Sequence, residues 1–128
     1  MSEDYEDLIQ QAIEARAASY SPYSKFKVGA ALLSVNGSVF TGCNVENASY
    51  GLAICAERTA ICKAVSTGVR EYEAIAVAAS PLASPCGACR QFIVEFGKEI
   101  TVISVDAENP SIRKIWKSSE LIPDSFEF

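Results

Sequence analysis

The sequence of 128 residues contains no histidine. This absence excludes Ser-His-Asp and Cys-His hydrolases, histidine-ligated metal sites and acid–base chemistry by imidazole. Any catalysis must therefore rest on carboxylates, thiolates, hydroxyls, amines or a metal ion. The chain also has no basic run, and its formal net charge is −5. Because a phosphate backbone requires a clustered positive surface, we expect a small neutral substrate and no nucleic-acid partner.

Long apolar stretches are missing as well. No segment approaches the length needed to span a bilayer, so we expect no membrane partner. The N-terminus lacks the basic and apolar regions of a signal peptide, which favours a cytoplasmic location where thiols stay reduced. The chain has five cysteines. In a reducing compartment this odd number favours metal binding, reactivity or burial over a disulfide framework.

The chain length predicts a single domain over residues 1–128, and an apolar content of 49% argues against disorder. A two-residue hairpin turn is expected at Asn36-Gly37, with positive φ at both positions. The element order predicts an α/β fold, a three-layer α/β/α sandwich around a mixed five-stranded sheet. The expected helices are 5–19, 55–66, 86–97 and a short capped one at 118–120, and the expected strands are 27–35, 38–44, 72–79, 100–105 and 112–116.

Two short segments carry the candidate chemistry, Cys55-Ala56-Glu57 and Pro85-Cys86-Gly87-Ala88-Cys89. A Cys-x-x-Cys turn at a helix start brings two sulfurs to one side, and a catalytic zinc takes three protein ligands and leaves one position open. We therefore expect Cys55, Cys86 and Cys89 to hold one zinc ion per chain. Glu57 lies two residues from Cys55, so it can reach a water molecule at the metal and move protons without ligating the metal.

The charge of this site needs compensation. Three thiolates around a divalent ion leave a net charge of −1, which weakens the metal as a Lewis acid. Both segments lie at predicted helix N-termini, where the helix dipole favours thiolates. Our hypothesis is that Arg58, next to Glu57, is a second positive group that donates to the sulfurs.

Other interpretations of the cysteines remain open at this point. A Cys-x-x-Cys pair is also typical of a redox pair or of a structural zinc half-site. Cys43 or Cys62 could complete a structural four-cysteine site, but Cys62 lies about two helical turns, roughly 10 Å, from Cys55. We expect both to be buried small apolar groups. Arg90 and Gln91 are assigned no catalytic role and are expected to support the third long helix or an interface.

The two segments together resemble the zinc signature of the cytidine and deoxycytidylate deaminase family in its three-cysteine form. The all-cysteine ligand set is similar to that of the small homotetrameric members, which act on free nucleosides. The resemblance extends to three further segments: 21–32, which is similar to the family's first-strand segment, 42–50, which is similar to its nucleoside-binding segment, and 121–126, which resembles its C-terminal tail.

This resemblance implies roles for individual positions. Asn44 and Glu46, on either side of Val45, would hydrogen-bond the ribose 3′-hydroxyl. Phe26 would pack against the base, and the Ala56 backbone would contact the base edge. An Asn and a Glu can grip a hydroxyl as donor and acceptor, and an aromatic ring can stack on a pyrimidine.

The resemblance also implies an assembly and a reaction. Ala48, Tyr50 and Phe126 would face the pocket of a neighbouring subunit in a homotetramer. The reaction would be hydrolytic deamination of cytidine and deoxycytidine to uridine and deoxyuridine plus ammonia in pyrimidine salvage, with Glu57 binding N3 and shuttling the proton. The alternatives are a blasticidin-S-type nucleoside deaminase, a nucleic-acid editor, and a structural zinc module without chemistry.

Overall fold

The structure, a computed structural model, describes residues 5–128. Its centre is a five-stranded sheet with the strand order β2-β1-β3-β4-β5. β3 and β4 run parallel, and the other neighbouring pairs are antiparallel. The predicted mixed five-stranded sheet is therefore confirmed. The strands are β1 (Gly29–Ser34), β2 (Val39–Cys43), β3 (Tyr72–Ala79), β4 (Thr101–Asp106) and β5 (Asn109–Lys117).

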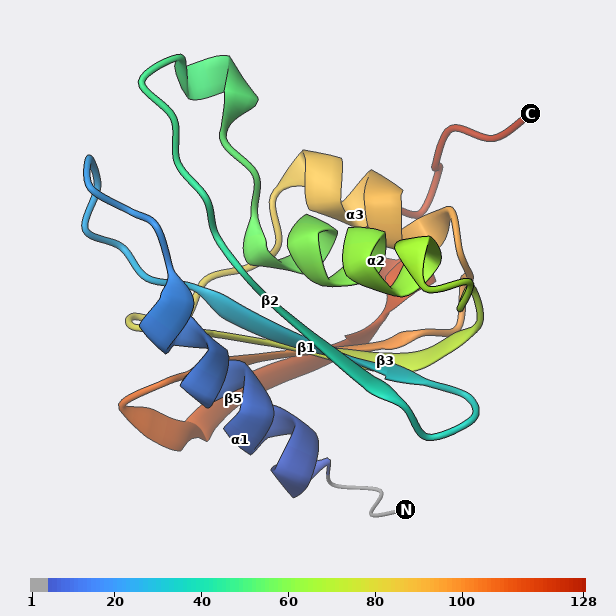
Figure 1. The fold of residues 1–128 in the computed structure, drawn as a ribbon. Coiled ribbons are helices and arrows are strands. Elements are labelled where there is room, and N and C mark those ends of the chain that lie inside the picture. Colours follow the sequence, from blue (N-terminus) through green and yellow to red (C-terminus); the bar gives the residue numbers. More distant parts are fainter. Residues whose placement is uncertain (1–4) are drawn as a thin grey trace.

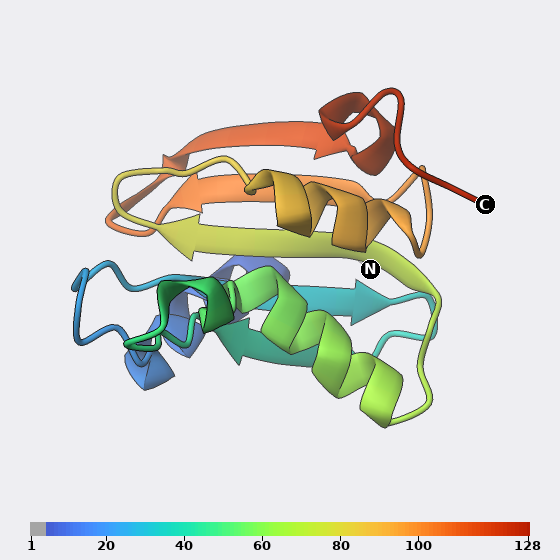
Figure 2. The same ribbon diagram turned by 90° about the horizontal axis from the view of Figure 1, so that it is seen from above.

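Helices cover both faces of the sheet, which confirms the predicted three-layer arrangement (Figure 1). α1 (Glu6–Ala15) packs against one face, whereas α2 (Ala56–Ser66) and α3 (Gly87–Val94) lie next to each other on the opposite face. Figure 2 looks onto that second face and shows that α2 and α3 begin at the same end of the sheet. Three further helices are short: η1 (Arg16–Ala18), η2 (Tyr50–Leu52) and α4 (Ser118–Leu121).

Side chains alternate between the two faces of a strand, so each face of the sheet has its own core. All six residues of β1 are buried because the strand is covered on both faces. On the α1 face, β3 presents a row of alanines, whose small side chains let the helix lie close. Among residues 5–128, none of the helices combines the length and the apolar character required to cross a membrane.

One glycine fixes how closely β2 approaches α2. A Cβ atom at Gly42 would lie 2.5 Å from the backbone nitrogen of Ala60 and 2.6 Å from the carbonyl oxygen of Ala56. Any larger residue would push α2 away from the sheet, because both neighbouring atoms belong to the helix backbone. Gly42 therefore sets the position of the first turn of α2, where the candidate site residues Ala56, Glu57 and Arg58 lie.

The turn between β1 and β2 differs from the prediction. Gly37 has a φ of 96°, but within residues 5–128 the only non-glycine residues with positive φ are Tyr5 and Lys25. The predicted positive φ at Asn36 is therefore wrong. The Asn36 side chain instead accepts a hydrogen bond of 3.1 Å from the Ser38 backbone N–H. This local bond allows a wider turn in which only the glycine is left-handed.

Several element boundaries also differ from the prediction: α1 ends at Ala15 rather than at 19 and is followed by η1, and β1 begins at Gly29 rather than at 27. β5 begins at Asn109 rather than at 112, because the Asp106 side chain accepts the Glu108 N–H at 2.9 Å and tightens the preceding turn. α3 ends at Val94 rather than at 97. After Val94 the backbone N–H groups of Phe96 and Gly97 bond to the carbonyl three residues earlier, as in a 3₁₀ helix, instead of four residues earlier.

Candidate active site

Three cysteine thiols meet where α2 and α3 begin. Cys55 is the N-cap residue of α2, and Cys86 is the N-cap residue of α3. Cys89 lies in the first turn of α3 and is fully buried. The three Sγ atoms lie within 4.8 Å of one another, and those of Cys55 and Cys86 are 3.7 Å apart. The structure thus brings together all three predicted metal ligands.

The spacing of these sulfurs fits a zinc ion. Two thiolates on a tetrahedral zinc, each bonded at about 2.3 Å, have sulfurs roughly 3.8 Å apart. Among residues 5–128 neither of the other two cysteines belongs to this group, so Cys55, Cys86 and Cys89 would supply the three protein ligands that a catalytic zinc requires. Cys43 is only partly buried and Cys62 is exposed. The prediction that these two are buried is therefore wrong for Cys62, which lies on the solvent side of α2.

The electrostatics of the thiols explain why a cation is needed. Hydrogen bonds from Cys89, from Arg58 and from Cys86 lower the pKa of Cys55 to about 5, against the effect of burial. The same interaction with Cys55, together with burial and nearby negative charge, raises the pKa of Cys89. Ionisation of the Cys55 thiol is therefore favoured, and ionisation of the Cys89 thiol beside it is opposed. A divalent ion would reduce this conflict, because it can bind all three thiolates and offset two of their three negative charges.

Arg58 supplies a positive charge at the same point. Its Nη2 atom lies 3.6 Å from the Sγ atom of Cys55. This contact raises the pKa of the guanidinium, which stays protonated. The Nε atom of Arg58 is buried without a hydrogen-bond partner among the described residues. Arg58 thus lies where the sequence hypothesis requires it.

Glu57 lies beside the thiols in the first turn of α2. Its side chain is only 4% exposed. Burial is the main cause that raises its pKa to about 7, and the negative charge of Cys55 adds to this effect. A carboxyl group with this pKa exists in both protonation states near neutral pH. It can therefore accept a proton and return it, which is the chemistry expected of a general acid–base group.

A cavity of about 270 Å³ lies in front of these groups. It joins most of the residues that the sequence predicted. Ile54 and the loop before Cys86 complete its wall, and the sequence did not point to them. The residues that line it are Phe26, Val28, Asn44, Val45, Glu46, Ala53, Ile54, Cys55, Ala56, Glu57, Val77, Ala83, Ser84 and Cys86.

Asn44 is held in one orientation at the outer part of the cavity. Its Nδ2 atom donates to the Phe26 carbonyl at 2.8 Å, and its Oδ1 atom accepts from the Val28 N–H at 3.0 Å and the Ser19 hydroxyl at 2.5 Å. These bonds use one of its two amide hydrogens and leave the other available. Asn44 therefore fixes the loop that carries Phe26 and still has a donor for a ligand.

Glu46 is held by the loop that precedes β1. Its Oε1 atom accepts the backbone N–H groups of Tyr23 at 3.0 Å and Ser24 at 3.1 Å. The Ser24 hydroxyl donates to its Oε2 atom and accepts the Phe26 N–H at 3.0 Å. The hydrogen bond from the Ser24 side chain is the main cause that lowers the pKa of Glu46. Ser24 was missed by the sequence analysis, because a serine in a turn segment carries no signal of its own.

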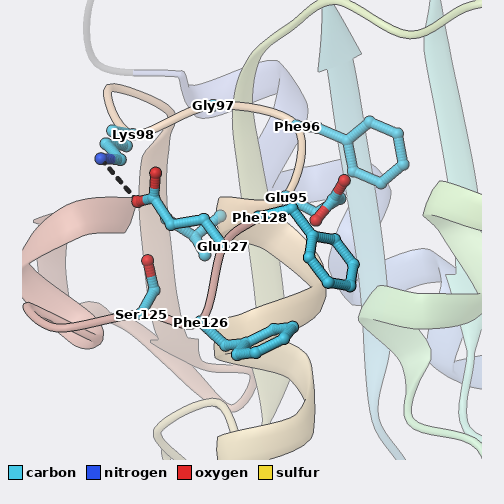
Figure 3. A pocket seen from close by; sticks show the side chains of 9 residues that line it. Glu95, Phe96, Gly97, Lys98, Ser125, Phe126, Glu127 and Phe128 are labelled. Atoms are coloured by element: carbon cyan, nitrogen blue, oxygen red, sulfur yellow. Dashed lines mark ion pairs between the residues drawn. The ribbon is translucent and has the colours of Figure 1, made fainter.

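Three of the predicted substrate-binding residues do not line this cavity. Ala48 is exposed on the loop after Glu46. Tyr50 is 80% exposed and lines a separate hollow that shares Glu46 and Ala53 with the main cavity. Phe126 lines a third hollow, formed by the C-terminal tail and the far end of α3 (Figure 3). The sequence assigned all three to a neighbouring subunit, so their place outside the cavity of their own chain agrees with that assignment without testing it.

The amino-acid sequence of the chain is similar to those of known zinc-binding deaminases. Residues 2–105 match the family model described as "Cytidine and deoxycytidylate deaminase zinc-binding region". The chain belongs to the cytidine and deoxycytidylate deaminase family. It is 50% identical over 125 residues to a cytidine deaminase of Halalkalibacterium halodurans, which covers 96% of this chain and 94% of that protein. It is 48% identical over 120 residues to a cytidine deaminase of Sporosarcina psychrophila, with 88% of each chain covered.

Solved structures of cytidine deaminases have the same fold. A structure from Burkholderia pseudomallei gives a TM-score of 0.90 at 46% identity and covers 98% of this chain and 100% of that chain. A second, from Mycobacterium tuberculosis, gives a TM-score of 0.84 at 39% identity and covers 99% and 100%. The predicted family is confirmed. The predicted zinc cofactor agrees with the zinc-binding description of the family and with a thiol group that could hold a metal ion.

Proposed function

We propose that this chain deaminates cytidine and deoxycytidine hydrolytically to uridine and deoxyuridine, with release of ammonia. One observation carries the proposal: the cluster of three thiols adjoins a cavity that is lined by the buried Glu57 and also by Asn44 and Glu46. This arrangement matches a cytosine ring at the metal end and a ribose at the polar end. Relatives that are about half identical to the chain are cytidine deaminases.

Different residues of the chain would bind the metal, transfer protons and compensate the negative charge of the thiolates. Zinc held by Cys55, Cys86 and Cys89, one ion per chain, would supply a Lewis acid that activates a water molecule. Glu57 takes a proton from the attacking water and delivers it to N3 of the base. It then takes the remaining proton from the hydroxyl group formed on C4 and passes it to the amino group, so that the C4–N bond breaks, ammonia leaves and a C4 carbonyl forms. Arg58 offsets the negative charge of the thiolates.

The binding groups orient the nucleoside. Phe26 packs on the base, and the Ala56 backbone contacts the base edge. Asn44 and Glu46, with Val45 between them, hold the ribose 3′-hydroxyl. Among residues 5–128, no lysine or arginine lines the main cavity or the hollow beside it. Because Glu46 is ionised there, a 5′-phosphate would meet negative charge without a partner, which favours nucleosides over nucleotides.

We also propose that the chain acts as a single domain in a cytoplasmic homotetramer without nucleic-acid or membrane partners. Exposed apolar side chains gather on the segments around the cavity, and apolar patches of this kind are typical of protein interfaces. In the tetramer, Ala48, Tyr50 and Phe126 would complete the pocket of a neighbouring subunit. The exposed residues of this patch are Tyr20, Tyr23, Val45, Tyr50, Leu52 and Ile54.

A substrate panel tests this function. Purified protein is incubated with cytidine, deoxycytidine, the 5′-monophosphate of cytidine and blasticidin S, and product and ammonia are measured. We expect turnover of both nucleosides, its loss after treatment with a zinc chelator and its return on addition of zinc. Light scattering should give the mass of four chains. Zinc binding without turnover of any nucleoside would instead identify a structural zinc module.

A further inference from the structure

The C-terminal tail is attached to α3 through one side chain. The Nε2 atom of Gln91 donates to the carbonyl oxygen of Phe126 at 2.9 Å. The Oε1 atom of the same carboxamide accepts the backbone N–H of Phe126 at 3.2 Å. Both backbone groups of one residue are thus paired with one side chain, as two residues pair across a β-ladder. This pairing restrains the direction in which the Phe126 ring leaves the backbone.

The ring itself has little support from its own subunit. Phe126 is 69% exposed, and its ring partner is Phe128 in the same tail, at a centroid distance of 5.3 Å. Figure 3 shows the two rings on the tail and the ion pair between Lys98 and Glu127 next to them. That ion pair, at 2.8 Å, joins two side chains that are each about 60% exposed. An exposed pair of this kind restrains the tail weakly, so the carboxamide of Gln91 is the stronger attachment.

The same helix also carries metal ligands. α3 begins after Cys86 and contains Cys89, and Gln91 follows two residues later. Arg90, between them, donates to the Pro85 carbonyl at 2.8 Å and to the Leu121 carbonyl at 3.0 Å. One short helix therefore fixes a subunit's own thiols and also the start and end of its C-terminal segment.

We infer that Gln91 is a positioning residue, whose carboxamide holds the Phe126 backbone so that the ring is presented to the pocket of a neighbouring subunit. The inference rests on the proposed function, because the role of Phe126 in a second subunit belongs to that proposal. Gln91 contacts neither base nor sugar. It affects nucleoside binding only through the ring that it places.

A double-mutant cycle on cytidine turnover tests the inference. We expect Phe126→Ala to raise KM about tenfold through loss of one stacking contact, with kcat and zinc content unchanged. Gln91→Met removes both hydrogen bonds at similar volume and should raise KM between about threefold and the Phe126→Ala value. The double variant should equal Phe126→Ala alone, because without the ring there is nothing left to position.

Two further variants make the result specific. Gln91→Glu keeps the acceptor for the Phe126 N–H but loses the donor to the carbonyl, so its KM should lie between those of the wild type and Gln91→Met. It also provides the test if Gln91→Met does not fold. Lys98→Ala breaks the neighbouring ion pair of the same tail and should leave KM unchanged.

The possible failures can be told apart. If Gln91→Met and Gln91→Glu leave KM unchanged while Phe126→Ala raises it, the inference is overturned and the proposed function stands. The inference also fails if the two changes add, or if kcat and zinc content fall with Gln91→Met, since Gln91 would then support the metal end of α3. An unchanged KM in Phe126→Ala overturns the role of Phe126 in the tetramer and the inference with it.

Discussion

The carboxyl groups of Glu57 and Glu46 line the same cavity, but they differ in burial and in the direction in which their pKa is shifted. Glu57 is buried in the first turn of α2, and burial raises its pKa to about 7. Glu46 lies on a partly exposed loop, and hydrogen bonds from Ser24 and its neighbours lower its pKa. Glu57 can therefore gain or lose a proton near neutral pH, whereas Glu46 stays ionised there. In the proposed function, a single residue type would thus serve proton transfer at one position of the cavity wall and substrate binding at another.

Replacement of Glu57 by Gln should give the largest effect. The carboxamide keeps the shape but cannot carry the proton, so we expect kcat to fall by about 10²–10⁴ with zinc content unchanged. Because its folded-state pKa is raised, ionisation of Glu57 lowers stability as the pH rises from 4.5 through about 7. The variant should therefore melt no lower than the wild type above that range. Full activity in zinc-loaded Glu57→Gln would rule out Glu57 as the proton carrier.

Arg58 connects the charge of the thiols to that of Glu57. The guanidinium lowers the pKa of both Cys55 and Glu57. In Arg58→Ala the acidic limb of the kcat/KM profile should therefore move to higher pH, and activity should fall about tenfold. Arg58→Lys keeps the charge and should shift the profile less. The same activity and the same pH profile in Arg58→Ala would show that Arg58 has no part in the chemistry.

Replacement of Glu46 should affect binding instead of chemistry. Glu46→Gln loses the charged acceptor for the sugar hydroxyl, so we expect KM to rise about tenfold while kcat changes little. Because the pKa of Glu46 is held below 4.5, its charge should not change between about pH 5 and 8. Glu95→Gln, at an exposed position directly after the last residue of α3, is the matched control. A large fall in kcat with unchanged KM would contradict the division between the two carboxylates.

The smallest effect is expected at Ser24. Ser24→Ala removes a donor to Glu46 and leaves the Phe26 N–H without its acceptor. The two backbone bonds to Glu46 remain, so KM should rise only about two- to threefold. Ser24→Thr keeps the hydroxyl and should bind cytidine like the wild type. If Ser24→Ala matched Glu46→Gln, the serine would be a direct ligand and no mere support.

The sequence predicted the metal end of the site better than the sugar end. Cys55, Cys86 and Cys89 were found because their spacing at helix starts has a specific chemical meaning, and Glu57 followed from its place beside Cys55. Ser24 was not found as a support, and Gln91 was expected to support its helix or an interface without its partner in the tail being foreseen, since the partners of these two residues lie about 20 and 35 positions away. Distant pairing of this kind leaves no pattern in a single sequence.

The same limit applies to the fold. Alternation and helical spacing predicted every strand and long helix of the sheet layers, and β3 matched the expected range of 72–79. Two of the errors lie where a side chain hydrogen-bonds to the backbone locally, whereas α3 ends early because its backbone hydrogen-bond pattern changes. Asn36 bonded to Ser38 changed the type of one turn, and Asp106 bonded to Glu108 shortened another. Propensities do not resolve such choices, because several turn geometries accept the same residues.

The three thiols come from two segments on either side of β3, and a metal bound by them would join the first turns of α2 and α3. Such an ion would link α2 to α3 in the folded protein, in addition to its part in the reaction. Any ligand that binds the folded chain more tightly than the unfolded chain raises the free energy of unfolding in proportion to the logarithm of its free concentration. The lifetime of the folded protein would therefore follow the supply of zinc, so that a shortage of the metal would first appear as lost protein rather than as inactive enzyme.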